Sequence, residues 1–128
     1  MAVVLFVCTG NAARSQMAEG LLKNIRPEFK VLSAGTKPEG LAPHAVVCMS
    51  ELDLDISNQI SKHINEVPWK KADYVITLCD SANETCVMMN WPKSCLRLHW
   101  PIPDPKTIDE FRSARDKIKH LINKFVNK

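Results

Sequence analysis

The chain alternates between short apolar runs and longer stretches in which apolar residues recur every three or four positions. Runs of four or five residues rich in β-branched side chains are typical of buried strands. They predict strands at residues 3–7, 30–34, 74–78 and 96–99, of which the last has the weakest pattern. Strands that alternate with helices form a parallel sheet with helices on both faces. We therefore expect an α/β fold, a single-domain three-layer sandwich at residues 1–128 around a four-stranded parallel sheet.

Helical spacing fills most of the intervals between these strands. A first helix is expected to begin near Ser15, whose hydroxyl can cap the first turn, and to end before Pro27. A second helix begins at Pro43, and a short third helix is capped by Ser57 and runs through residue 64. Residues 36–42 are expected to form a loop, and residues 108–125 one long amphipathic helix.

Composition and charge are those of an ordinary globular chain, with 45% hydrophobic and 24% charged residues. The formal net charge of +3 is small, and no long run of Lys and Arg indicates binding to nucleic acid. Basic residues near the end of the chain, among them Arg112 and Arg115, are expected to form the solvated face of the last helix.

The sequence contains no feature of a membrane or secreted protein. No apolar run approaches the roughly 20 residues of a membrane span, and the first strand is too short for the apolar region of a signal peptide. The five cysteines, an odd number, favour thiols that react or stay reduced over a fixed set of disulfides. We expect a cytoplasmic protein that binds neither nucleic acid nor membrane.

The strongest chemical signal joins the first strand to the first helix, in the stretch Cys8-Thr9-Gly10-Asn11-Ala12-Ala13-Arg14-Ser15. The N–H groups at a helix start have no intrahelical partner, so they bind anions, and the same field stabilises a thiolate. Arg14 adds a planar fork of donors that suits a tetrahedral oxyanion. The stretch predicts a Cys8 nucleophile in an oxyanion cradle made of Thr9, Gly10, Asn11, Ala12, Ala13 and Arg14.

A second cluster, residues 79–86, starts with Cys79 at the end of the third strand and finishes with Cys86. The carboxyl ends of parallel strands share one edge of a sheet, so Cys8 and Cys79 are expected on the same edge. The small polar residues between Cys79 and Cys86 suit a mobile loop or a marginal helix. On a helix the two cysteines would be roughly 10 Å apart, too far for a disulfide. Two unrelated cysteines explain the spacing equally well, and it does not match a zinc site.

A third feature is Asp104, which stands between Pro103 and Pro105 on a loop that the two prolines stiffen. A carboxyl group held beside an oxyanion site can act as a general acid toward a leaving oxygen. A plain Asp-Pro turn before the last helix explains the same residues, so this pattern alone leaves both interpretations open.

Together these residues resemble those of the low-molecular-weight protein tyrosine phosphatase superfamily and, within it, the thioredoxin-coupled arsenate reductases. The loop with Cys8, five intervening residues and Arg14 is similar to the superfamily's signature. The resemblance covers essentially the whole chain, including Ser33-Ala34-Gly35, Asp53-Leu54-Asp55-Ile56-Ser57, Thr77-Leu78-Cys79 and Asp104-Pro105. The pair Cys79 and Cys86 is what separates the reductase branch from the phosphatases.

The resemblance implies a reaction that uses three thiols and no cofactor. Cys8 would attack arsenate held by the loop and Arg14. Ser15 would hydrogen-bond the thiolate, and Asp104 would protonate the departing oxygen. Cys79 would then attack the Cys8 adduct and release arsenite. Cys86 would attack Cys79, leaving a Cys79–Cys86 disulfide for thioredoxin to reduce, and phosphate would compete with arsenate as a similar oxyanion.

Some positions depart from the relatives' pattern. Ala13 stands where many relatives carry a second loop cysteine, so no redox switch is expected inside the loop. Lys106 and Thr107 follow Asp104-Pro105 where phosphotyrosine phosphatases have an aromatic residue. Lys62 stands where some reductases have an acid that helps to hold potassium, and we expect no metal here.

Three functions from different classes remain after this comparison. The first is arsenate reduction, and the second is hydrolysis of phosphoesters with Cys8, Arg14 and Asp104 alone. The third is a thiol redox sensor that binds an oxyanion or a partner without catalysis. The remaining cysteines, Cys48 and Cys95, match nothing in the resemblance and are expected to be structural.

Overall fold

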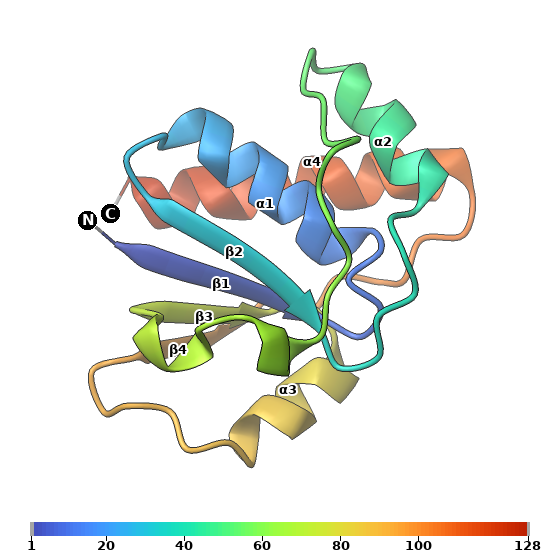
Figure 1. The fold of residues 1–128 in the computed structure, drawn as a ribbon. Coiled ribbons are helices and arrows are strands. Elements are labelled where there is room, and N and C mark those ends of the chain that lie inside the picture. Colours follow the sequence, from blue (N-terminus) through green and yellow to red (C-terminus); the bar gives the residue numbers. More distant parts are fainter. Residues whose placement is uncertain (1, 128) are drawn as a thin grey trace.

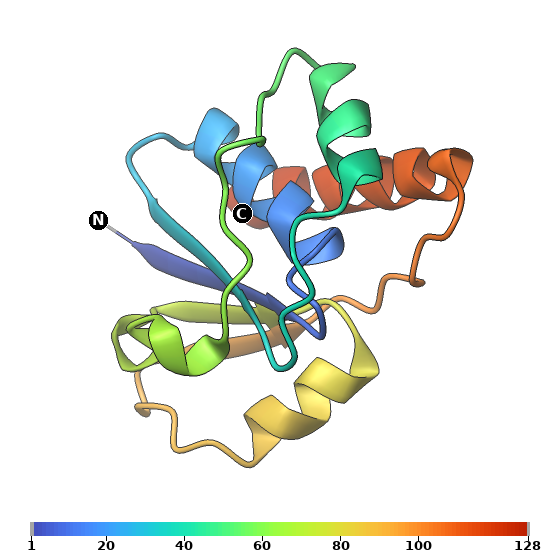
Figure 2. The ribbon, with the colours of Figure 1, turned by 45° about the vertical axis from the view of Figure 1, so that its right-hand side comes forward.

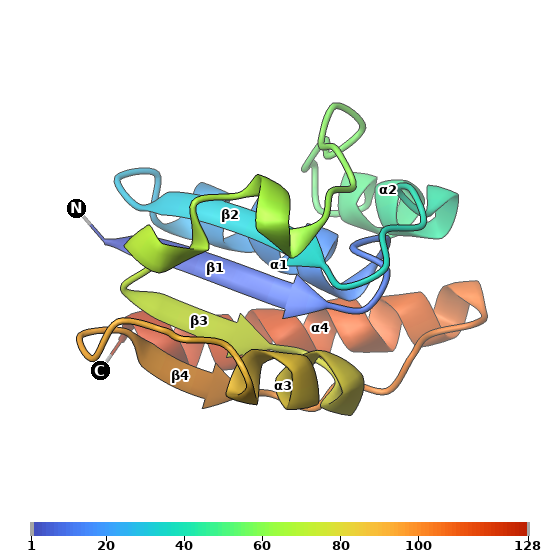
Figure 3. The same ribbon diagram turned by 60° about the horizontal axis from the view of Figure 1, so that its bottom comes forward.

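A computed structural model describes residues 2–127 and contains one sheet of four parallel strands. The strands are β1 (Val3–Cys8), β2 (Lys30–Gly35), β3 (Tyr74–Thr77) and β4 (Leu96–His99), and their order across the sheet is β2-β1-β3-β4. All four arrowheads point the same way in Figure 3. This confirms the predicted sheet; β1 and β2 each run one residue further than expected, and β3 stops one residue earlier.

The helices cover both faces of the sheet, as expected. They are α1 (Arg14–Ile25), α2 (Pro43–Ser50), α3 (Asp80–Val87) and α4 (Ile108–Val126), with short 3₁₀ turns at Ile64–Glu66 and Trp69–Lys71. Helices α1, α2 and α4 pack together on one side, and α3 lies alone on the other (Figure 1). No helix within residues 2–127 is long and apolar enough to span a bilayer.

The central strand β1 buries both of its faces, which explains its continuous apolar sequence. Val4 and Phe6 face the core under α1 and α4, whereas Leu5 and Val7 face a second core on the side of α3. All four side chains are fully buried. Because β1 is covered on both sides, its carboxyl end is buried too. Cys8, the last residue of β1, therefore lies at a buried position.

The prediction of a short helix from Ser57 through residue 64 is wrong. Residues 57 and 58 form a turn, and the chain then runs extended beside the end of β2 until residue 63 (Figure 2). Backbone groups that a helix would need for itself serve the neighbouring loop instead. The Lys62 N–H donates to Asn11 Oδ1 at 3.0 Å, and the Lys62 carbonyl accepts from the Gly35 N–H at 2.9 Å.

The prediction that Arg115 belongs to the solvated face of α4 is wrong. Its side chain is buried, with 8% of the residue exposed. The Nη1 group of Arg115 donates to the Cys48 carbonyl and to Glu51 Oε1, each at 2.8 Å. Glu51 also accepts from the more exposed Arg112, with Nη2 at 2.8 Å. The pair of guanidinium groups therefore fastens the end of α2 to α4 through one carboxylate.

An acid titration is expected to expose this contact. Hydrogen bonds from Arg112 and then Arg115 lower the pKa of Glu51 from 4.5 to about 2. Because the folded pKa is the lower one, the stabilisation is complete above about pH 4.5 and is lost as the pH falls toward 2. Thermal unfolding of Glu51→Gln should thus occur at a lower temperature than that of the unsubstituted protein at neutral pH, and this difference should close across that window. Glu84→Gln, at an exposed carboxylate of α3, is the control. A difference that persists unchanged below pH 2 would contradict this account.

Candidate active site

The loop between β1 and α1 has its carbonyl groups tied to a neighbouring segment. The backbone N–H groups of residues 36–42 supply the donors. The bonds run from Thr36 to the Cys8 carbonyl at 3.3 Å, Lys37 to Thr9 at 2.8 Å, Glu39 to Gly10 at 2.9 Å and Ala42 to Ala12 at 2.9 Å. With their carbonyls turned outward to these donors, the peptide groups direct their N–H ends to the inside of the loop.

These inward N–H groups remain available to a ligand. Within residues 2–127, the backbone bonds of the loops, turns and caps include none that is donated by an N–H group of residues 9–13. They border a cavity of about 240 Å³ that also reaches two carboxylates. Its lining is Cys8, Thr9, Gly10, Ala12, Ala13, Arg14, Glu39 and Asp104. The structure thus gathers the predicted nucleophile, the predicted acid and five of the six predicted cradle residues around one space.

Asn11, the sixth cradle residue, supports the loop from behind. It has a positive φ of 46°, a conformation that Asn tolerates better than most residues, and its side chain is fully buried. Its Nδ2 donates to Ser15 Oγ at 2.7 Å and to Ser33 Oγ at 3.0 Å. These bonds join the loop to α1 and to β2, so the cradle is held in shape by its own buried amide.

Cys8 lies at the bottom of the cavity with its Sγ 2.8 Å from Ser15 Oγ. The expectation that Ser15 caps α1 is wrong, because the helix begins one residue earlier and its N-cap, Ala13, makes no side-chain bond. Since Ser15 Oγ already accepts from Asn11, its own proton is free to point at the Cys8 sulfur. The hydroxyl that was expected to satisfy a backbone N–H contacts the Cys8 sulfur instead.

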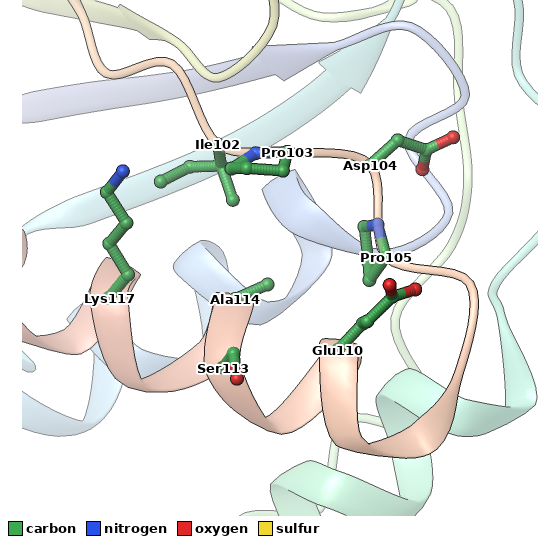
Figure 4. A pocket seen from close by; sticks show the side chains of 8 residues that line it. All are labelled: Ile102, Pro103, Asp104, Pro105, Glu110, Ser113, Ala114 and Lys117. Atoms are coloured by element: carbon green, nitrogen blue, oxygen red, sulfur yellow. The ribbon is translucent and has the colours of Figure 1, made fainter.

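Arg14 and Asp104 meet on one side of the cavity. Arg14 Nη1 donates to the Ile102 carbonyl at 2.9 Å, and its Nη2 lies 3.8 Å from Asp104 Oδ1. The other oxygen of Asp104 accepts from Lys106 Nζ at 2.7 Å. A groove of about 220 Å³ separates residues 102–105 from α4, and the Asp104 carboxylate is turned away from that helix (Figure 4). Asp104 therefore lies beside the cradle on the loop between the two prolines, where the sequence predicted a carboxyl group.

Cys79 lies close to the loop, as its strand-end position predicts. Its Sγ is 3.2 Å from the Thr9 hydroxyl and also accepts the Ala82 N–H at 3.4 Å, which caps α3. A second cavity, of about 350 Å³, is lined by both Cys79 and Arg14. The guanidinium group therefore borders both spaces, and the second thiol stands at the boundary between them.

Cys86 is buried in the last turn of α3, with 3% of the residue exposed. Of the two states expected for residues 79–86, the structure contains the helix. Burial raises the pKa of the Cys86 thiol to about 11, and the nearby Cys79 contributes further in the same direction. With one cysteine at each end of an eight-residue helix, pairing of the two sulfurs requires α3 to unwind.

Glu39 is the residue of the cavity that the sequence did not indicate. It lies in the loop of residues 36–42, and its carboxyl carbon is 3.2 Å from the point where a Cβ on Gly10 would stand. The backbone bonds between residues 36–42 and the loop, including that from Glu39 to Gly10, bring this carboxylate to the cradle. A single acid in an exposed loop leaves no periodic or motif signal. Cys48 and Cys95 lie apart from the cavity in the two apolar cores.

The thiol and the arginine, separated by five residues around a loop with inward N–H groups, decide the family. Residues 3–128 match the family described as low molecular weight phosphotyrosine protein phosphatase. The chain belongs to this family. Similar proteins include several that are named arsenate reductase. Arsenate reductase 1 of Staphylococcus saprophyticus is 43% identical over 125 residues, which cover 95% of this chain and 94% of that relative.

Solved structures of the family share the fold over nearly the whole chain. One, described as an arsenate reductase in the phosphate binding state, has a TM-score of 0.83 at 30% identity and covers 99% of this chain and 98% of its own. The thioredoxin-dependent arsenate reductase of Corynebacterium glutamicum has a TM-score of 0.81 at 27% identity. That match covers 99% of this chain and 61% of the Corynebacterium chain.

Proposed function

We propose that residues 1–128 form one catalytic domain that reduces arsenate to arsenite through Cys8, Cys79 and Cys86. The observation that carries this proposal is the position of Cys79, whose Sγ lies 3.2 Å from Thr9 on the rim of the loop that holds Cys8. A phosphatase needs a nucleophile, an arginine and an acid, and it has no use for a second thiol at that point. The names of the relatives support the same choice of substrate.

In the first step the Cys8 sulfur attacks arsenic. The inward N–H groups and Arg14 hold the arsenate oxygens and stabilise the charge that develops on them. A sulfur–arsenic bond forms, an arsenic–oxygen bond breaks, and Asp104 supplies the proton with which that oxygen leaves as water. Before the attack the Ser15 hydroxyl donates a hydrogen bond to the Cys8 thiolate and so stabilises its charge. Phosphate, with the same shape and charge, competes for the cradle.

The next two steps move a disulfide outward. Cys79 attacks the Cys8 sulfur, so that a sulfur–sulfur bond forms while the electron pair of the sulfur–arsenic bond stays on arsenic, which leaves as arsenite. Cys86 then attacks Cys79 and frees the Cys8 thiolate for another cycle. The resulting Cys79–Cys86 disulfide is reduced by thioredoxin. We place the reaction in the cytoplasm, where free cysteines stay reduced.

The deciding experiment measures steady-state arsenite production by the complete chain. Thioredoxin, thioredoxin reductase and NADPH should sustain many turnovers, whereas glutaredoxin with glutathione should not. The reason is that the relay ends on an intramolecular Cys79–Cys86 disulfide, which a dithiol protein such as thioredoxin reduces. Addition of phosphate should raise the KM for arsenate without lowering kcat. Absence of arsenite with both reducing systems, together with rapid hydrolysis of an aryl phosphate, would establish the phosphatase instead.

A further inference from the structure

Helix α3, which must unwind for the last transfer, is fastened to the sheet at its first turn. One fastening is the Cys79 sulfur, which accepts the Ala82 N–H at 3.4 Å. The other is a chain of polar contacts from the two neighbouring strands. His99 of β4 lies between Thr77 of β3 and Asp80 of α3, with Nδ1 at 2.8 Å from the Thr77 hydroxyl and Nε2 at 3.0 Å from Asp80 Oδ1.

We call these four residues, Thr77, His99, Asp80 and Asn83, the His99 latch. The Thr77 hydroxyl also lies 3.2 Å from Asn83 Oδ1, so the latch contacts two positions of the first turn of α3. Thr77 is almost fully buried, whereas Asp80 is exposed on the surface. The imidazole ring therefore bridges a buried hydroxyl on β3 and an exposed carboxylate on α3.

Beyond its first turn, α3 packs on the sheet through few side chains. Ala82 and Cys86 are its only buried residues in the described chain. Between the helix and the strands there is a cavity of about 280 Å³, and both Cys86 and His99 line it. A helix of eight residues has little stability of its own, so its folded state depends on the packing and fastenings that it has. At the other end of the helix, Trp91 Nε1 donates to the Cys86 carbonyl at 2.7 Å, so the first and last turns are each held by polar contacts.

The reaction itself removes one of the two fastenings. When Cys79 bonds to Cys8, its sulfur turns from the Ala82 N–H to the loop, and α3 loses its N-cap. The His99 latch makes no contact with Cys8 and is unaffected by this step. After the first disulfide forms, the latch still holds the first turn of α3, and Trp91 still holds the last turn at the Cys86 carbonyl.

We propose that His99 is a positioning residue that controls when α3 opens and so when Cys86 reaches Cys79. The proposal rests on the relay described above. In the resting protein the intact cap and the latch together keep Cys86 away from Cys79. Once the cap is lost, the latch is what still holds the first turn, and so it limits how often the helix opens there and the rate of the second transfer.

The first test measures alkylation of Cys86 by iodoacetamide in the reduced protein, followed by mass spectrometry of the peptides. His99→Ala should raise the rate of Cys86 alkylation about fivefold, since the opening equilibrium loses its partly exposed hydrogen bonds. Asp80→Asn should act in the same direction. His120→Ala, on the exposed side of α4, is the matched control and should change nothing. Cys48 and Cys95 in the same samples report any general loosening of the protein.

The second test measures the reduction potential of the Cys79–Cys86 couple in a Cys8→Ser chain, where Cys8 cannot compete. The latch stabilises only the helical dithiol form, so His99→Ala should favour the disulfide about fivefold and lower the potential by about 20 mV. An unchanged Cys86 rate and potential would overturn the proposal, and so would equal acceleration at all three buried cysteines with a lower Tm. Neither readout needs arsenate or thioredoxin, so a failure of the latch and a failure of the proposed reductase are told apart.

Discussion

A Cys86→Ser protein is expected to convert one equivalent of arsenate per chain and then stop. Cys8 and Cys79 remain, so the first arsenite is released and a Cys8–Cys79 disulfide forms. Without Cys86 this disulfide stays in the buried loop, where Cys8 has only 2% of its surface exposed and a protein reductant cannot reach it. Steady-state arsenite production with thioredoxin should fall about a thousandfold or more.

The measurement is a burst experiment that follows arsenite with time at known enzyme concentration. Hydrolysis of an aryl phosphate, which uses Cys8, Arg14 and Asp104, should be nearly unchanged in the same variant. Cys95→Ser is the matched control, because Cys95 is a buried cysteine of the same apolar core as Cys86 and has no part in the relay. Continued turnover of Cys86→Ser with thioredoxin alone would show that the relay is wrong.

The second large effect is expected from Arg14→Lys. The guanidinium group of Arg14 is held by the Ile102 carbonyl at 2.9 Å, which leaves its other donors directed at the cavity. A lysine keeps the charge but has no planar fork, so it cannot hold the carbonyl and two oxyanion oxygens at once. The kcat/KM for arsenate should fall roughly 10²–10³-fold, the usual effect of removing one positioned donor from an oxyanion site.

Both activities should decline together in this variant, because arsenate and an aryl phosphate occupy the same cradle. The measurement compares kcat/KM for the two substrates with that of Arg26→Lys. Arg26 follows the far end of α1, where it donates to the Val126 carbonyl at 3.2 Å, and this control should be almost fully active. An Arg14→Lys enzyme within a few fold of the unsubstituted protein would remove Arg14 from the cradle. Cys86→Ser thus separates the two activities, and Arg14→Lys does not.

The local pattern of the sequence was enough for the architecture and for the centre of the site. The apolar run at residues 3–7 has to be covered on both sides, which requires a parallel sheet between two layers of helices. Cys8 and Arg14 are brought together by the turn that joins a strand to a helix, a geometry that depends on a few consecutive residues. The place of Cys79 followed from the shared edge of parallel strands, and the Thr9–Cys79 contact confirms it.

What only the tertiary structure decided depends on partners far away in the chain. Residues 57–63 are extended because their backbone serves Asn11 and Gly35, and Arg115 is buried because Cys48 and Glu51 lie opposite it. Ser15 turns to Cys8 because Asn11, itself fixed by bonds to Ser33 and Lys62, occupies its acceptor site. Periodicity and caps report how a segment meets water and its own neighbours, whereas the Lys62–Asn11 and Arg115–Cys48 bonds join residues 51 and 67 positions apart in the chain. The His99 latch is of the same kind: its residues come from two strands and a helix, and they meet only when the sheet is complete.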